Sequence, residues 1–390
     1  MLAVEKARAT YRIARDSRLP AIGATGALTR ERQPGFLFGS PTPETVSYYS
    51  AGVGVSNFEL DLFGRVASLS HAALQRYFAD SEARRAAQLS LVAEVANAYL
   101  TLAADTERLR LAGAALDSQR ASYGLTEQQH AIGAVSDLDL SQARTTVESA
   151  RVDVARYAGA VAQDEDALAL LVGLPIDAGL RPATFTPEVS GLAPLPAGLR
   201  AAALLRRPDV REAEHVLRSA DASIGAARAA FFPSVTLTGN VGSAGSDLAG
   251  LFKSGTGTWS FVPQVSIPVF QGGALRAGLA GANADRDIAL ARHEQAIQTS
   301  FREVSDALAL TATLGQQREA QQALADAAAN AFWLSEQRYR AGRDSYLVLL
   351  DAQRSDYAAQ QALIAVRLAE QSNRVTLYKA LGGGWRETSK

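Results

Sequence analysis

The side chains that most often carry enzyme chemistry are thinly spread along this 390-residue chain. It contains no cysteine, which excludes disulfides and thiolate-based metal or redox sites. Its histidines are His71, His130, His215 and His293, and no two of them have the spacing of paired metal ligands. The segment GLFKSGTGT (250–258) faintly resembles a phosphate-binding loop but lacks the Lys-Ser/Thr pair after its second glycine. We therefore expect no enzyme activity, no metal and no cofactor.

A polar segment that occurs twice is a stronger signal. LTEQQHAIGAVSDLDLSQA starts at position 125 and LSEQRYRAGRDSYLVLLDA at position 334, and they share Leu, Glu, Gln, Gly, Ser, Leu, Leu and Ala at a constant offset of 209 residues. Gly133 and Gly342 stand where the chain would reverse. Ser136 and Ser345 follow at the N-cap position of a returning helix. The segment therefore predicts the tip of an antiparallel helical hairpin, present twice.

The duplication extends over the whole chain. AEVANA (93–98) aligns with REVSDA (302–307) at the same offset, and RLPAIGATG lies opposite FFPSVTLTG further upstream. A period this long indicates duplication of a module rather than a short solenoid repeat. We expect a first repeat over 1–173, a Pro- and Gly-rich linker over 174–207 and a second repeat over 208–390.

Each repeat is expected to run in the order helix, strand, strand, long helix, tip, long helix, which makes the fold mainly α with β. In TWSFVPQVSIPVF, apolar residues alternate with Ser260, Gln264 and Ser266, which is the period of a strand with one apolar face. Residues 65–112 contain neither Gly nor Pro, as a long helix requires. The predicted strands span 20–32, 46–61, 233–243 and 257–270, and the predicted long helices span 64–131, 134–172, 272–341 and 345–381.

Apolar residues on the long helices recur at steps of three and four, the spacing of a coiled-coil seam. Abundant alanine would let such helices pack closely. The predicted seam residues are Leu89, Val92, Ala96, Tyr99 and Ala103 in the first repeat and Ile297, Phe301, Val304 and Leu308 in the second.

The strand pattern raises the question of a membrane. No run of 18 apolar residues occurs, so no transmembrane helix is predicted. Four strands cannot close a barrel, whereas three chains would supply about twelve strands, an even number suited to an outer-membrane barrel. The same pattern also fits a soluble coiled-coil protein with two small hairpins. Period and length alone leave both alternatives open.

Six segments narrow this choice. They cover essentially the whole chain in order, and they resemble the TolC-like outer membrane factors, most closely the NodT-type efflux lipoprotein branch. The segments are NFELDLFGRV (57–66), LLRRPDVREAEHVLRSADASIGAARAAFFPSVTLTG (204–239), PVFQGGALRA (268–277), FREVSDALA (301–309), YRAGRDSYLVLLDAQRS (339–355) and LYKALGGGW (377–385).

This resemblance implies a homotrimer with a twelve-stranded β-barrel in the bacterial outer membrane and an α-helical barrel in the periplasm. It implies a passive exit channel for drugs or other small molecules, served by a periplasmic adaptor and an inner-membrane pump of the resistance-nodulation-division type. Outer-membrane lipid would surround the barrel, and with a net charge of −1 no nucleic-acid partner is expected. The alternative is a periplasmic coiled-coil adaptor or scaffold without a pore. An adaptor, however, would carry one hairpin rather than two.

The resemblance also implies a periplasmic iris closed by the helical tips. Asp351 matches an acidic constriction residue, and a threefold ring of carboxylates would attract cations. The second constriction acid of the family is Val348 here. Spacing alone would favour an ordinary solvated helix residue at Asp351, whereas the resemblance favours the gate. The tip residues Gly133, Ser136, Gly342 and Ser345 are expected to dock the adaptor.

Two further gate positions follow from the resemblance. Asp139 and Tyr339 match a pair that links neighbouring inner helices, although Tyr339 could equally serve helix packing. A linking arginine is expected two residues after Gly342, where Asp344 stands with Arg343 beside it. The iris is therefore expected to be present but differently linked.

Aromatic residues on the predicted strands suggest where the membrane would lie. Tyr48, Tyr49, Trp259 and Phe261 could form an interfacial girdle or pack within a strand pair. The family begins with a signal peptide, and this branch with a lipid-carrying cysteine; neither is found in this chain. We accordingly expect the first helix to be cut at its start.

Overall fold

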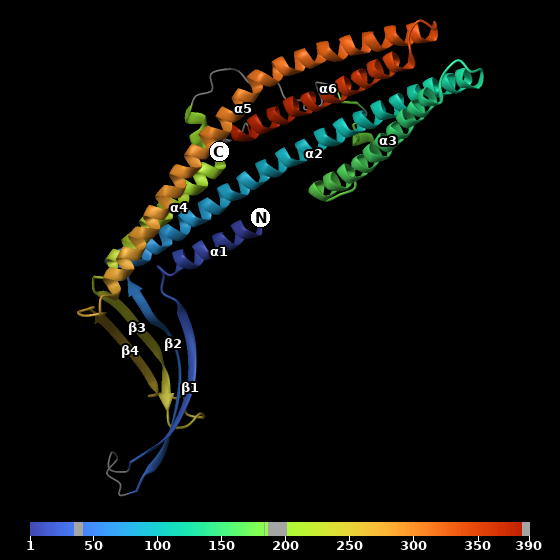
Figure 1. The fold of residues 1–390 in the computed structure, drawn as a ribbon. Helices are drawn as coiled ribbons and strands as arrows, with labels where there is room; N and C mark the ends of the chain where they lie inside the picture. Colours follow the sequence, from blue (N-terminus) through green and yellow to red (C-terminus); the bar gives the residue numbers. More distant parts are fainter. Residues whose placement is uncertain (35–41, 183, 186–200, 384–390) are drawn as a thin grey trace. The chain divides into compact units, whose positions relative to one another are not determined.

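The computed structural model describes residues 1–34, 42–182, 184–185 and 201–383. Twice along the chain, a pair of strands is followed by two long helices (Figure 1). None of the described helices is long and apolar enough to cross a membrane. The elements in order are α1 (Leu2–Asp16), β1 (Ile22–Gln33), β2 (Glu44–Leu60), α2 (Arg65–Ala131), α3 (Asp137–Val172), η2 (Ala178–Leu180), η3 (Ala201–Arg206), α4 (Pro208–Ala229), β3 (Ser234–Gly245), β4 (Gly257–Ser266), α5 (Ala274–Arg340) and α6 (Tyr346–Ala380).

The chain divides into two compact units that cut across the sequence repeats. The first unit comprises Met1–Arg84 and Pro208–Ala296, and the second comprises Arg85–Arg207 and Ile297–Lys390. Each unit thus takes one part of both repeats, and α2 and α5 belong partly to each. Each unit is therefore assembled from segments of both repeats.

The first unit contains one antiparallel sheet in the order β1-β2-β3-β4 (Figure 1). The first repeat contributes the hairpin β1–β2 and the second contributes β3–β4. The central pair β2–β3 joins the repeats, with Val53 opposite Val241 and a bulge between Val55 and Phe58. Among the described strands, β1 and β4 each have one unpaired edge.

The register separates an apolar face from a polar face because successive strand residues point to opposite sides. Ile22, Val53, Val241 and Trp259 share one face, since Ala24 pairs with Val53, Val53 with Val241 and Val241 with Trp259. The opposite face carries small and polar residues. Among its members are Thr25, Ser50, Thr236, Thr238, Asn240, Ser260 and Gln264.

Two expectations about the strands need correction. The strand predicted over 257–270 ends at Ser266, because β3, its only partner among the described strands, begins at Ser234 and leaves the later residues unpaired. Pro268 follows at once and has no N–H to donate. Tyr48 and Tyr49 are consecutive on β2 and so lie on opposite faces, with Tyr49 on the apolar face opposite Leu28. They cannot both belong to one membrane-facing girdle.

The core of the second unit consists of alanines and a few large apolar side chains. Ala103 and Ala104 are fully buried, and they pack with Leu100, Ile364 and Val375. The small alanine side chains let helix backbones approach, so large side chains on the flanks are left outside. The predicted seam is therefore only partly right: Ala103 and Val304 are buried, whereas Val92, Phe301 and Leu308 are about half exposed within one chain.

The predicted linker over 174–207 is described only in part, since residues 183 and 186–200 lie outside the described residues. It contains the short helices η2 and η3. At its end, buried Arg207 donates hydrogen bonds to the Ala380 carbonyl (2.9 Å) and to Glu303 (2.7 Å). The linker is thereby fixed to α5 and to the end of α6 within the second unit.

Candidate functional site

The two hairpin tips have the same backbone. Gly133 and Gly342 adopt left-handed φ angles of 73° and 69°. The N–H of Gly133 donates to the His130 carbonyl and that of Ala134 to the Gln129 carbonyl, both at 2.9 Å. Gly342 and Arg343 repeat these bonds to Tyr339 and Arg338, also at 2.9 Å. This pair of bonds is the Schellman motif, which favours glycine at the left-handed position because glycine has no Cβ.

The helices that return from the tips are capped differently. The Ser136 hydroxyl accepts from the Asp139 N–H, and the Asp139 carboxylate accepts from the Ser136 N–H, which forms a complete capping box. Ser345 occupies the N-cap of α6 without a side-chain cap. Val348 stands at the position of Asp139 and offers no carboxylate, so the reciprocal bond to the N–H of Ser345 cannot form either.

Tyr339 joins the two hairpins of one chain. Its side chain is 5% exposed, and its hydroxyl donates to Gln129 Oε1 at 3.0 Å and lies 3.2 Å from the Thr126 hydroxyl. Its ring packs edge-on against Tyr346, 5.9 Å between centroids. Ala143 belongs to the same buried cluster. The structure thus places Tyr339 in the contact between α2 and α5, and its bonded partners within the chain do not include Asp139.

The remaining candidate gate residues are exposed. Val348 and Asp351 lie on one exposed face of α6, almost one turn apart, while the opposite face with Tyr346 and Leu350 is buried. Arg343 is exposed in the turn. Within one chain, therefore, Val348 and Asp351 form a common surface on α6, and Arg343 lies in the turn that precedes the helix.

A bidentate ion pair spans the second tip. Arg338 donates from Nε and a terminal nitrogen to the Asp344 carboxylate, at 2.6 and 2.8 Å. These hydrogen bonds hold the pKa of Asp344 below its usual range. Asp344, which stands where the resemblance predicted an arginine, is therefore bound within its own turn.

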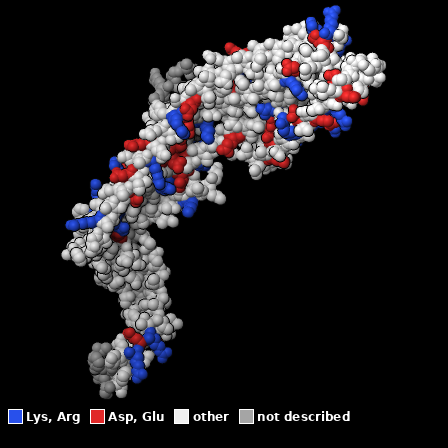
Figure 2. All heavy atoms as spheres, viewed as in Figure 1, with Lys and Arg blue, Asp and Glu red and all other residues white. Residues whose placement is uncertain are grey.

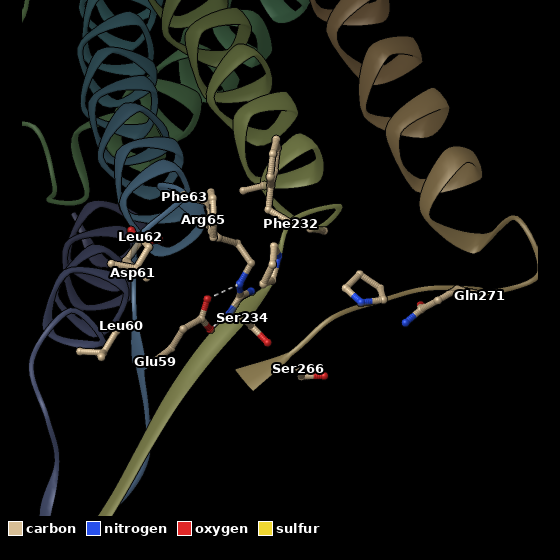
Figure 3. A pocket seen from close by; sticks show the side chains of 14 residues that line it. Glu59, Leu60, Asp61, Leu62, Phe63, Arg65, Phe232, Ser234, Ser266 and Gln271 are labelled. Carbon is tan, nitrogen blue, oxygen red and sulfur yellow. Dashed lines mark hydrogen bonds and ion pairs between the residues drawn. The ribbon is translucent and has the colours of Figure 1, made fainter. Parts of the chain in front are cut away.

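A pocket lies in the first unit where the strands meet the helices (Figure 3). Arg65 pairs with Glu59 through two hydrogen bonds, and Asp61 accepts from the Ala67 N–H at 2.7 Å at the start of α2. Phe63 and Phe232 stack at 4.9 Å. The Arg65–Glu59 ion pair, the Asp61 cap and the stacked phenylalanine rings together fix the direction in which α2 leaves the sheet. The cavity of about 280 Å³ is lined by backbone and these structural side chains and has no nucleophile–base pair.

No arrangement for covalent chemistry appears at the tips or in the pocket. In the part of the chain that the structure describes, no group of three or more His, Asp or Glu side chains could hold a metal ion. The sequence reasoning missed Thr126, Gln129 and Tyr346 as partners of Tyr339. The alignment of the two repeats could have pointed to these residues. At the offset of 209 residues, Tyr339 stands at the position of His130 and Arg338 at that of Gln129, so the segment around Gln129 is the equivalent of the one that carries Tyr339.

A four-stranded sheet with two open edges and one apolar face, continued by two helical hairpins, defines the class of outer-membrane channel-forming proteins. The family model described as outer membrane efflux protein matches residues 1–174 and 199–383. The chain belongs to this family. Its duplicated unit of two strands and a long helical hairpin is the family fold, and the family's function is that of an outer-membrane efflux channel rather than an adaptor or an enzyme.

Relatives and solved structures agree with this assignment. The chain is 48% identical over 381 residues to the probable efflux pump outer membrane protein TtgC of Pseudomonas putida, covering 97% of this chain and 78% of the relative. It is 43% identical to OprJ of Pseudomonas aeruginosa, covering 99% and 81%. The crystal structure of the open state of the Neisseria gonorrhoeae MtrE outer membrane channel matches with a TM-score of 0.89 and 40% identity, over 98% of this chain and 85% of that one.

Proposed function

We propose that three copies of this chain form a passive exit duct. The two open edges of the sheet carry this proposal. β1 and β4 each present unpaired backbone groups, and such edges cannot face lipid. Joining β4 of one copy to β1 of the next closes twelve strands, with the apolar face outward and the polar face lining the duct. The repeats 1–173 and 208–390 then alternate around the axis.

The internal duplication gives the register of this seam. β2 and β3 are the equivalents of β4 and β1, and they are already paired within the chain. In the alignment of the repeats, Gly26 on β1 corresponds to Gly239 on β3, and Val55 on β2 then corresponds to Val265 on β4. Val55 pairs with Gly239 within the chain, so the equivalent pair between copies is Val265 with Gly26. We therefore place Val265 of one copy opposite Gly26 of the next.

Engineered cysteines test this register directly, because the chain has none of its own. Val265→Cys with Gly26→Cys should give a disulfide-linked trimer, since paired strand residues bring Cα atoms to about 4.5–5.5 Å. A Cβ at Gly26 meets nothing closer than 3.9 Å. Val265→Cys with Ala24→Cys or with Leu28→Cys is displaced by two residues, about 8 Å between Cα atoms, and should form no disulfide between copies. Equal linking in all three variants would overturn the register.

We further propose that the hairpin tips close the periplasmic end of the duct. Val348 and Asp351 share an exposed face of α6, which is what an axis-facing constriction requires. Asp139 and Tyr339 would restrain the tips, the former through its capping box and the latter through Gln129. Arg343 is left exposed for contact with a neighbouring copy or a partner.

Conductance in a planar lipid bilayer tests the gate. Asp351→Ala should enlarge the openings and weaken cation selectivity, because a ring of negative charge is removed. Asp166→Ala, which removes another exposed carboxylate from α3, is the matched control and should change neither. Identical openings in the wild type and Asp351→Ala would remove Asp351 from the gate. No conductance from a protein that stays soluble without detergent would refute the duct itself.

The partners and cargo follow from the same proposal. A periplasmic adaptor would dock on the tips around Gly133, Ser136, Gly342 and Ser345, and an inner-membrane pump of the resistance-nodulation-division type would deliver the cargo. Relatives are named for efflux of toluene, solvents and antibiotics. We propose small organic molecules of this kind as cargo, and the many small polar residues of the polar face, such as Thr25, Ser50 and Thr238, would let them pass without strong binding.

A further inference from the structure

Two arginines lie on the apolar face of the sheet. Arg30 and Arg32 share the face of Ile22 and Leu28 on β1, because strand residues two apart point to the same side. Both side chains are exposed. Figure 2 shows uncharged atoms over the middle of the sheet and a group of charged side chains at the end of the β1–β2 hairpin. The basic residues therefore begin where the apolar surface ends.

The extent of the apolar surface sets the depth of these arginines in a bilayer. On β2, apolar residues occupy this face from Leu60 to Tyr49, and the next residues on the face are Ser47 and Thr45. That stretch rises about 35 Å along the strand, or about 27 Å across the membrane at the usual strand tilt of a barrel. The apolar band of an outer-membrane barrel is about 25 Å tall. Arg30 pairs with Ser47, just past the band, so it reaches the headgroup layer.

No acidic side chain neutralises the two arginines on that face. Among the described residues, neither guanidinium takes part in a hydrogen bond or an ion pair. Glu31 stands between them in sequence but lies on the opposite face, where it accepts from Gln33. The second repeat has Ser243 at the position equivalent to Arg30, so the feature belongs to the first repeat alone.

We propose that Arg30 and Arg32 form a binding site for the phosphate groups of a phosphorylated glycolipid in the outer leaflet. This site rests on the proposed trimeric barrel, which puts the hairpin end on the side away from the helices. Guanidinium groups bind phosphate through paired N–H donors. At the same time the neighbouring Leu28 and Tyr49 offer apolar surface to the acyl chains. A lipid that combines phosphate and acyl chains matches both parts of the surface.

The seam register adds aromatic surface to this site. In that register, Phe261 and Trp259 of the partner subunit come opposite Arg30 and Arg32 on the same face. An arginine beside an aromatic ring keeps its N–H edge free for an anion while its plane packs on the ring. The trimer would then carry three such sites, one at each seam.

Native mass spectrometry of the detergent-purified channel tests the site with lipid A as the probe. We expect the wild type to retain bisphosphorylated lipid A, and Arg30→Gln/Arg32→Gln to bind it about 10- to 30-fold more weakly, since each basic side chain near an anionic surface accounts for about a five-fold change. Arg8→Gln/Arg12→Gln removes the same charge from exposed positions on α1 and should bind as the wild type does. Lipid A stripped of both phosphates should bind weakly to all three proteins.

Each contrary result overturns the site. Equal lipid A binding by Arg30→Gln/Arg32→Gln and the wild type, or an equal loss in Arg8→Gln/Arg12→Gln, would show that these arginines form no specific site. Displacement of lipid A by 1 mM inorganic phosphate, roughly the concentration range in which a simple anion site fills, would indicate a free-anion site instead. If the double variant fails to assemble, Arg30→Gln and Arg32→Gln alone should each weaken binding about five-fold. Conductance of the variants separates this proposal from the duct, because loss of lipid binding with normal openings leaves the duct intact.

Discussion

Replacing Asp164 with asparagine should stabilise the first helical hairpin at neutral pH. Asp164 on α3 faces Asp105 on α2, and Asp105 is paired with Arg108 at 2.5 Å. Asp164 Oδ2 is buried without a hydrogen-bond partner. Burial is the main reason that the pKa of Asp164 rises to about 6, and the Asp105 charge and a shared hydrogen bond raise it further against the opposing effect of Arg108.

The sign and size of the effect follow from this pKa. A carboxyl whose folded pKa lies above its unfolded value of 3.8 favours the folded state when it is protonated, so this contribution is complete below pH 3.8 and is lost as the pH rises to about 6. The full shift corresponds to about 3 kcal/mol. Asp164 is only partly buried, and solvent screening reduces this to about 1 kcal/mol. Asparagine has the shape of the protonated acid and does not titrate.

Hydrogen exchange of the α2–α3 amides, compared between variant and wild type at one pH, measures the effect. At pH 7.5, Asp164→Asn should slow exchange about five-fold, which corresponds to about 1 kcal/mol. The difference should shrink as the pH falls toward 4.5. Asp166→Asn, an exposed residue on the same helix, should change nothing. A difference that is equal at both pH values, or absent at pH 7.5, would refute the reasoning.

Three further substitutions test the tips by the same exchange method. Ser136→Ala should speed exchange at the start of α3 about five-fold through loss of a cap bond, whereas Ser345→Ala, which has no cap bond to lose, should have little effect; equal effects would contradict the capping difference. Gly342→Ala should destabilise its tip by about 1–2 kcal/mol, while Gly124→Ala within α2 should be neutral or stabilising, and a harmless Gly342→Ala would rule out the left-handed turn. Tyr339→Phe should cost about 1 kcal/mol of the contact between α2 and α5, and unchanged exchange on both helices would mean that its hydroxyl does not join them.

The order of elements could be predicted from the sequence because its signals are local. Alternation in 257–266 predicted a strand with one apolar face, and the register puts Trp259 and Phe261 on that face. Gly133 and Gly342 predicted reversals because only glycine readily takes a left-handed turn. Such signals depend on a few neighbouring residues, so a single amino-acid sequence is enough to detect them.

The contacts between segments were harder to predict. The predicted coiled-coil seam placed Val92 and Phe301 inward because of their size and spacing. In the structure these side chains are about half exposed, and alanines such as Ala103 are buried instead. Tyr339 followed from resemblance as a link, and its partners Gln129 and Thr126 lie more than 200 residues away in sequence. Nothing in the spacing of one hairpin states which side chain of the other it meets. The predicted roles of Asp139, Arg343 and Asp351 depend on neighbouring copies and stay predictions.

The two tips with one backbone and different side chains have a consequence for recognition. A trimer would present six turns of the same shape, but only three would carry the Arg338–Asp344 pair and the exposed Arg343, and the other three would carry Ala134 and Val135. A docking partner that recognises the shape of the turn could bind at six equivalent positions, whereas one that recognises an exposed arginine in the turn would find three. A substitution in one tip changes three of the six turns and leaves the other three as they were. Partner binding at one set of turns and closure of the duct at the other can therefore change independently.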